Sequence, residues 1–257
     1  MIDVFKMSFP ADDEMTERDV YVYLPTAYDR EKERNFPVLY MFDGQNVFFD
    51  EDATYGKSWG LGKYLDYTDT PLIVAAVQCN TSGDNFRLSE YSPFPFHDSN
   101  YGDFEGKGES TMQWMIRELK PRIDSEYRTL PDREHTLIAG SSMGGLMSLY
   151  ALIKHNDIYS RAAALSPSIW VDRKALENLA LSSSLSKDSI LYMDYGADEF
   201  RYGKGMLNSF AVFTSKLMKK GIMVCSRIIP SGDHSEQSWE KQNPLFIQTI
   251  MYGFPTD

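Results

Sequence analysis

The stretch from His135 to Gly145, which reads HTLIAGSSMGG, decides the fold class of this chain. Its first residues form an apolar run that predicts a buried strand over His135 to Ala139, and the residues after the stretch predict an amphipathic helix. Between the two lies a G-x-S-x-G turn, residues Gly140 to Gly144. A serine on such a tight strand-to-helix turn projects its hydroxyl from the end of the sheet.

Ser142 is the serine that fits this pattern, because Ser141 would need a glycine at Ala139. Glycines two residues before and two residues after the serine remove side chains that would collide with the neighbouring strand and helix. We therefore predict Ser142 as a nucleophile. The next residue, Met143, is predicted to supply one backbone N–H to a developing oxyanion. The alternative interpretation is a plain glycine-rich turn.

Strands and helices alternate along the rest of the chain. Apolar or alternating runs predict strands over Asp19 to Leu24, Val38 to Phe42, Leu72 to Val77, Arg161 to Leu165, Ile190 to Asp194 and Met223 to Ile229. Helical spacing predicts helices over Thr111 to Tyr127, Met206 to Lys219 and Ser238 to Tyr252. This order indicates an α/β fold, one domain over residues 1–257, with a mainly parallel central sheet and helices on both faces.

Two long segments without periodicity, Asp43 to Trp59 and Gln78 to Gly108, follow core strands. Unstructured loops of this length are uncommon unless they are functional, and ligands bind at the carboxyl ends of parallel strands. We expect both segments to build the substrate pocket. In the first, Gln45 is predicted to supply the second oxyanion N–H, although Asp43-Gly44 is also a common turn dipeptide.

A serine hydroxyl needs a base, and the base needs an orienting acid. Of the four histidines, His135 opens a strand at the far end of the sheet and His155 ends the helix after Ser142. His97 lies in the second long loop, and His234 follows the last predicted strand. The chain order serine, acid, histidine is met by His234, which we predict as the base.

Three carboxylates compete for the role of the acid, in the segment DYGADE that begins at Asp194. Asp194 lies within or at the end of its strand, where a structural role is expected. Asp198 and Glu199 both lie beyond Gly196, where the strand turns. The residues alone leave the choice open.

Composition limits the classes of partner. The 257 residues are 42% hydrophobic and 25% charged with a net charge of −11, which is typical of a globular protein and disfavours nucleic acid and anionic membranes as partners. No leader-like segment and no run of about 18 apolar residues is present, so we expect a cytoplasmic protein. Cys79 and Cys225 are expected to be unpaired core thiols. No ligand spacing indicates a metal, and no cofactor is predicted.

Five segments, VLYMFDGQNVF, ELKPRID, IAGSSMGGLMSLYAL, ALSPSIW and GDHSEQSW, are together similar to the esterase D and enterochelin-esterase-like group of α/β-hydrolases. The resemblance extends from about Asp19 to Tyr252. It implies an α/β-hydrolase fold and a serine hydrolase that acts on carboxylic esters. The acid of this group usually lies three residues after a strand-ending glycine, which is Glu199 here, and Asp198 is the less favoured choice. The group's Asp-Gly-x donor maps to Gln45.

The resemblance implies a small-molecule ester substrate with a small acyl, aromatic acyl or siderophore-lactone group. Four residues are predicted to contact it: Trp59, Arg87, Tyr91 and Trp170. Phe94 and Phe96 are further candidates, and Arg87 suits a carboxylate or a polar acyl group. The alternative is that these aromatic side chains pack the long loops. Acyl transfer and a catalytically silent binding protein are the alternatives to hydrolysis, and the sequence defines no oligomeric state.

Overall fold

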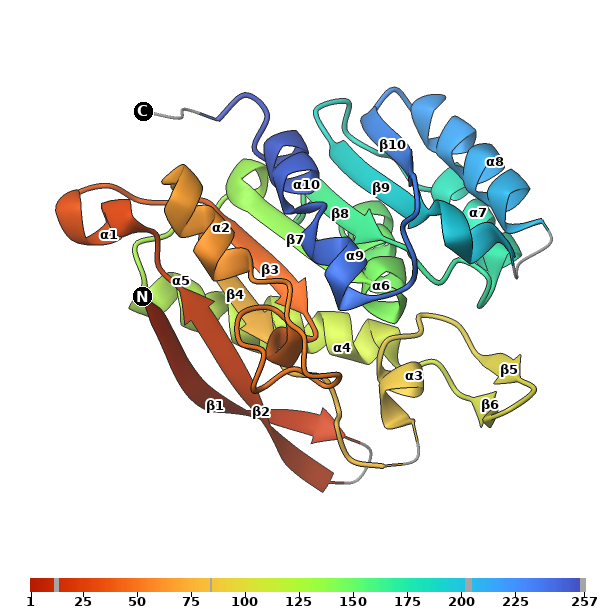
Figure 1. Cartoon of the computed structure of the whole chain (residues 1–257), viewed down its shortest axis with the longest axis horizontal. Helices are drawn as coiled ribbons and strands as arrows, with labels where there is room; N and C mark the ends of the chain where they lie inside the picture. Colours follow the sequence, from red (N-terminus) through yellow and green to blue (C-terminus); the bar gives the residue numbers. More distant parts are fainter. Residues whose placement is uncertain (12–13, 84, 202–204, 255–257) are drawn as a thin grey trace.

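The computed structural model describes residues 1–11, 14–83, 85–201 and 205–254. Its centre is an eight-stranded sheet with the order β1-β2-β4-β3-β7-β8-β9-β10 (Figure 1). The strands are β1 (Ile2–Ala11), β2 (Glu14–Tyr23), β3 (Val38–Phe42), β4 (Ile73–Val77), β7 (Thr136–Ser141), β8 (Arg161–Leu165), β9 (Ile190–Gly196) and β10 (Met223–Ile229). The six strands from β4 to β10 in this order run parallel, whereas β1 and β2 form an antiparallel hairpin at one edge.

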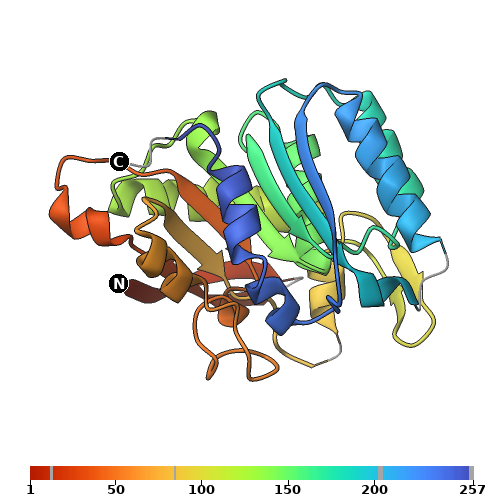
Figure 2. The same cartoon turned by 45° about the horizontal axis from the view of Figure 1, so that its top comes forward.

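Helices cover both faces of the sheet. One face carries α4 (Gly108–Trp114), α5 (Lys120–Glu126), α6 (Met143–Lys154), α7 (Arg173–Ser182) and α8 (Met206–Met218). The other carries α2 (Leu61–Thr68), α9 (Glu236–Glu240) and α10 (Asn243–Ile250). Figure 2 shows α10 lying across the near face of the strands. The predicted α/β-hydrolase architecture is confirmed.

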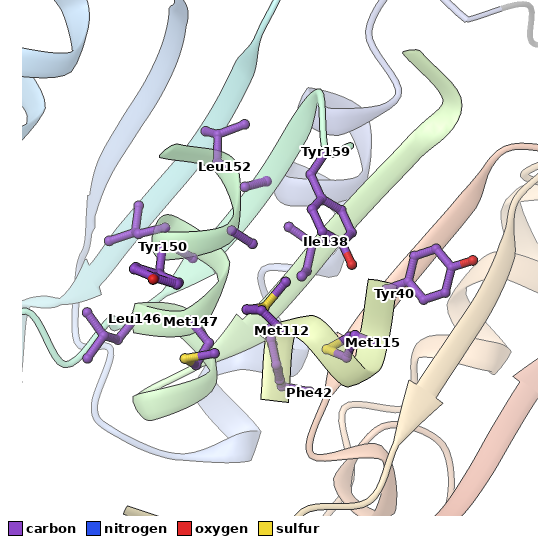
Figure 3. Close-up of a cluster of buried hydrophobic side chains, with 14 of the residues drawn as sticks. Tyr40, Phe42, Met112, Met115, Ile138, Leu146, Met147, Tyr150, Leu152 and Tyr159 are labelled. Carbon is purple, nitrogen blue, oxygen red and sulfur yellow. The ribbon is translucent and has the colours of Figure 1, made fainter. Parts of the chain in front are cut away.

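Strand β3 shows why the apolar runs of the sequence are continuous. Tyr40 and Phe42 belong to the buried cluster that also contains Met112 of α4, Met147 of α6 and Ile138 of β7 (Figure 3). The intervening residues of β3 point into the opposite cluster, which α2 and α10 cover. Because both faces are buried, each strand position must be apolar, and the polar-apolar alternation of a half-exposed strand disappears.

Two predicted helices are interrupted in the structure. The helix predicted over Thr111 to Tyr127 is α4, a π-helical turn over Met115–Leu119 and α5. Pro121 lies at the start of α5, and its ring would clash with the preceding turn of a regular α-helix, so the chain widens there. The helix predicted over Ser238 to Tyr252 is divided into α9 and α10, with Pro244 in the first turn of α10.

Several elements were not predicted. They are β1, the short helices α1 (Thr26–Arg30), α2, α3 (Phe86–Glu90) and α7, and a small hairpin of β5 (Phe96–Asp98) and β6 (Gly102–Phe104). Strand β1 lies at the edge of the sheet and is defined by its pairing with β2, from Ile2 opposite Tyr23 to Ala11 opposite Glu14. None of the helices in the described part of the chain has the length and apolar character needed to cross a membrane.

Candidate active site

Ser142 occupies the sharp turn between β7 and α6. Its backbone has φ 56° and ψ −120°, a strained conformation for a residue with a side chain. The end of β8 holds it in place: the Ser142 N–H donates to the Leu165 carbonyl, and the Ser142 carbonyl accepts from the Ser168 N–H, both at 2.9 Å. The Ser142 hydroxyl lies 3.4 Å from the Ser168 hydroxyl.

The glycine spacing around Ser142 has a steric cause. A Cβ on Gly140 would lie 2.7 Å from the backbone of Gly144, and a Cβ on Gly144 would lie 2.9 Å from Phe42 Cβ. The strand before the turn, the helix after it and β3 therefore approach closely only because both positions lack side chains.

His234 lies in the loop between β10 and α9, and Glu199 in a 3₁₀ turn over Ala197–Arg201 that follows β9. The Nδ1 of His234 lies 2.8 Å from Glu199 Oε2. The other carboxylate oxygen, Oε1, accepts from the Ser166 hydroxyl at 2.6 Å and from the Gly196 N–H at 2.7 Å. Burial opposes ionisation, but hydrogen bonds from His234, Ser166 and Gly196 outweigh it and lower the pKa of Glu199.

The two competing carboxylates have other positions. Asp198 follows Ala197 in the same turn, and its N–H donates to the Gly232 carbonyl at 3.0 Å, which ties this turn to the His234 loop. Asp194 is buried within β9, where it accepts from the Tyr192 hydroxyl at 2.7 Å and the Ser166 N–H at 3.2 Å. Burial raises the pKa of Asp194 to about 7.

Ser166 was not singled out from the sequence. It follows β8 with φ 43°, donates to Glu199 and accepts from the Trp239 indole N–H at 3.0 Å. The Trp239 ring packs edge-on against the His234 ring, with centroids 5.0 Å apart. Ser166 thus connects Glu199 to α9, the helix whose Trp239 packs against His234. Its position directly after a core strand, beside the strand of the acid, was the available signal.

The loop after β3 carries Gln45 in a 3₁₀ turn over Gly44–Asn46. Its side chain is buried and exchanges two hydrogen bonds with Cys79, to the thiol at 3.2 Å and from the N–H at 3.3 Å. Asp43, which begins the turn, has φ 58°. Its carboxylate accepts from Arg87 Nε and Nη2, both at 2.6 Å, and its N–H donates to the Tyr91 hydroxyl at 3.3 Å.

These contacts fix the loop that carries Gln45 opposite the start of α6. Met143 is the first residue of α6, and a backbone N–H in the first turn of a helix has no partner within the helix. The prediction that the Met143 and Gln45 N–H groups stabilise an oxyanion therefore concerns the start of α6 and the loop after β3.

A cavity of about 600 Å³ opens over these residues. Ser142 and His234 line it together with residues 43, 45 and 46, 54 and 55, 79–83, 85, 87, 141, 235, 236 and 239. Both long segments singled out in the sequence thus contribute to the cavity. Amide and hydroxyl side chains dominate the lining, with Tyr55 and Trp239 as its aromatic residues.

The predicted substrate-contacting residues are dispersed. Arg87 lines the cavity but is engaged with Asp43. The other three are not among the described lining residues: Trp59, Tyr91 and Trp170.

Each of these three aromatic side chains has a different packing role. Trp59 is buried against Trp239 and Phe246 in the α10 cluster, and Tyr91 packs beneath Phe42. Trp170 is half exposed, against Phe96 of the β5–β6 hairpin. The packing of Trp59 and Tyr91 favours the alternative raised from the sequence, and contact of the three residues with substrate stays a prediction.

The remaining histidines are not among the described residues that line the cavity, whereas Cys79 lines it. His155 contacts Glu109 at 3.1 Å, His135 contacts Asp132 and His97 contacts Asp103, each pair at 2.8 Å. Cys79 and Cys225 are unpaired. No group of three or more potential metal ligands occurs in the residues that the structure describes.

Comparison with known proteins identifies the family of the chain. The sequence profile described as "Putative esterase" matches residues 14–252, and the chain belongs to this family. The protein is thereby placed among the carboxylic ester hydrolases. It is 23% identical to the Bacillus subtilis (strain 168) protein "Uncharacterized protein YbbA", over 90% of this chain and 91% of that one.

Two solved structures illustrate the shared fold. An IroE-like serine hydrolase from Shewanella oneidensis superposes with a TM-score of 0.72 and 20% identity, over 96% of this chain and 81% of the other. The siderophore hydrolase EstA from Aspergillus nidulans superposes with a TM-score of 0.73 and 16% identity, over 95% and 93%. The enterochelin-esterase-like resemblance stated from the sequence is confirmed.

Replacement of Asp194 by Asn tests whether this buried carboxyl titrates. Its folded pKa of about 7 lies above the ordinary 3.8, so the folded state binds the proton more tightly and stability falls as the pH rises between the two values. The free energy of unfolding of Asp194→Asn, relative to that of the wild type, should therefore be higher at about pH 8 than at about pH 5. Urea unfolding at both pH values measures this difference. If the difference in free energy of unfolding between variant and wild type is the same at both pH values, Asp194 does not titrate in this range.

Replacement of Ser166 by Ala should lower kcat by roughly tenfold with little change in KM, because Glu199 loses one of its hydrogen bonds. The acid limb of the rate profile should move to higher pH, since the lost bond favoured the ionised carboxylate. Ser160→Ala, which removes a buried hydroxyl near the opposite end of β8, is the control. Equal effects of the two variants on the pH profile would argue against a positioning role for Ser166.

Proposed function

We propose that the protein hydrolyses esters through an acyl-enzyme on Ser142, with His234 as the general base and Glu199 as the acid that orients it. The observation that carries the proposal is the 2.8 Å contact between His234 Nδ1 and Glu199 Oε2. This contact commits Nδ1 as a donor to the carboxylate and leaves Nε2 as the nitrogen that accepts a proton.

In the acylation step, the Ser142 hydroxyl adds to the ester carbonyl while His234 Nε2 takes its proton. The negative charge that develops on the carbonyl oxygen is stabilised by the backbone N–H groups of Met143 and Gln45. The tetrahedral intermediate then breaks the bond to the alcohol oxygen, which receives the proton from His234. The acyl group remains bound to Ser142 as an ester.

In the deacylation step, water adds to the acyl-enzyme carbonyl and gives its proton to His234. Breakdown of the second intermediate returns that proton to Ser142 and releases the carboxylic acid. Glu199 stays ionised throughout, because its hydrogen bonds lower its pKa, and it stabilises the imidazolium that forms twice per cycle.

The cavity supports a small or medium ester with polar substituents. Its volume of about 600 Å³ and its amide and hydroxyl lining favour an acyl or alcohol part that forms hydrogen bonds over a long alkyl chain. A siderophore-lactone or hydroxylated aromatic acyl ester meets this description. The structural similarity to the siderophore hydrolase from Aspergillus nidulans favours the lactone class within it.

Replacement of Ser142 by Ala should lower p-nitrophenyl acetate turnover by at least ~10³-fold without loss of fold, because it removes one hydroxyl at a turn. Labelling by a fluorophosphonate should disappear with it. Circular dichroism and thermal unfolding verify that the variant is folded. Turnover or labelling retained in pure, folded Ser142→Ala protein would exclude Ser142 as the nucleophile.

Two neighbouring substitutions test the acid. Glu199→Gln should lower kcat by ~10²-fold or more, because the amide no longer stabilises the imidazolium of His234. Asp198→Asn changes a carboxylate to its amide at the adjacent position and should leave kcat within about threefold, as it would for a group outside the triad. If Asp198→Asn has the larger effect on kcat, the acid is Asp198.

A further inference from the structure

The carboxylate of Glu236 lies in the wall of the cavity and has no use in the mechanism described above. It belongs to the first turn of α9, two residues after His234, and it is 7% exposed. Its carboxylate accepts a long hydrogen bond, 3.5 Å from Asn46 Nδ2 to Oε1, and a hydrogen bond from its own backbone N–H. Among the described residues, no Lys, Arg or His nitrogen lies within the 4.0 Å of an ion pair to this carboxylate.

The other charged groups of the cavity wall do not balance this charge. Asp43 and Arg87 are the remaining Asp, Glu, Lys or Arg residues among the described lining, and they are joined by two hydrogen bonds of 2.6 Å. Arg87 is therefore occupied by Asp43. Within the described part of the lining, two carboxylates and one guanidinium give a formal net charge of −1, and Glu236 is the carboxylate without an ion-pair partner.

The surroundings of Glu236 suit an organic cation. Trp239, one turn further along α9, and Tyr55, on the opposite long loop, are the aromatic residues of the same lining. A cation near an aromatic face is stabilised by the ring quadrupole, and a carboxylate adds a charge-assisted hydrogen bond or a Coulomb attraction. Burial raises the pKa of Glu236, as does the Asp43 charge, while the charges of His234 and Arg87 oppose the rise. A bound cation would supply the missing counter-charge.

We propose that Glu236, with Trp239 and Tyr55, forms a cation subsite of the ester-binding cavity, and that the preferred substrates carry an ammonium group. The inference rests on the proposed function, because the cavity is assigned to substrate by its contact with Ser142 and His234. It also predicts that an ester whose acyl part ends in a carboxylate is a poor substrate, because the charge of Glu236 repels that carboxylate.

Matched esters test the charge preference directly. The p-nitrophenyl esters of 6-aminohexanoic, heptanoic and pimelic acid place a cation, a methyl group or a carboxylate at the same distance from the reacting carbonyl. Butyrylcholine and 3,3-dimethylbutyl butyrate form a second pair, with the charge on the alcohol. The wild type should favour the cationic member of at least one series by about tenfold or more in kcat/KM. The pimelate ester should be the poorest of its series.

Glu236→Gln should abolish the preference, because it keeps the shape of the side chain and removes the charge. The measured quantity is the ratio of kcat/KM for cationic and neutral esters, so a general loss of rate does not affect it. Glu240→Gln is the matched control. It removes another carboxylate of α9, one that pairs with Lys57 at 2.8 Å, and it should keep the wild-type ratio of kcat/KM for cationic and neutral esters.

Equal kcat/KM for cationic and neutral esters in both series would overturn the inference, as would a preference for the pimelate ester. A cation preference that survives in Glu236→Gln would also overturn it. These outcomes differ from failure of the proposed function, which would appear as turnover of the neutral esters by Ser142→Ala protein.

Discussion

The site depends on the Glu199 carboxylate, which is shared by three segments of the chain. It accepts from Ser166 after β8 and from Gly196 at the end of β9, and it contacts His234 after β10. Hydrogen bonds to an ionised acceptor are stronger than neutral ones, and here they outweigh the cost of burying the charge. One side chain therefore links the segments that follow three neighbouring strands.

Close backbone contacts make this arrangement rigid. A Cβ on Gly196 would lie 2.3 Å from the backbone of Gly232, so the loops of acid and base touch at a point where neither has a side chain. The strained turn at Ser142 is held by β8, and the loop of Gln45 by the ion pair of Asp43. Strain at such sites persists only where the surrounding structure over-determines it. The residues proposed as catalytic are thus held in place by contacts within the protein.

The parts of this structure that could be predicted from the sequence are those determined by residues close together in the chain. The buried parallel strands and the turn at Ser142 were predicted because continuous apolar runs and glycine spacing leave direct marks in the sequence. Glu199 was selected over Asp198 by family spacing, since adjacent carboxylates cannot be distinguished by composition. The assignment of the catalytic roles remains a proposal.

The features that could not be predicted from the sequence depend on long-range packing. Strand β1 is defined by its pairing with β2. The sequence around Trp59 and Tyr91 does not distinguish an aromatic side chain that packs a loop from one that lines a cavity. Ser166 and Glu236 matter because of residues brought near them by the fold. The ion pair of Arg87 with Asp43, 44 positions away in the chain, was not predicted, and a contact of Arg87 with substrate stays a prediction.

Proton NMR of the His234 Nδ1–H tests the central claim most directly. A proton held between an imidazolium and a buried carboxylate resonates far downfield of other histidine protons and exchanges slowly with water. We predict such a resonance in the wild-type protein, its retention in Asp198→Asn and its loss in Glu199→Gln. Loss of the resonance in Asp198→Asn, with retention in Glu199→Gln, would contradict the account of Glu199 as the group that positions the base.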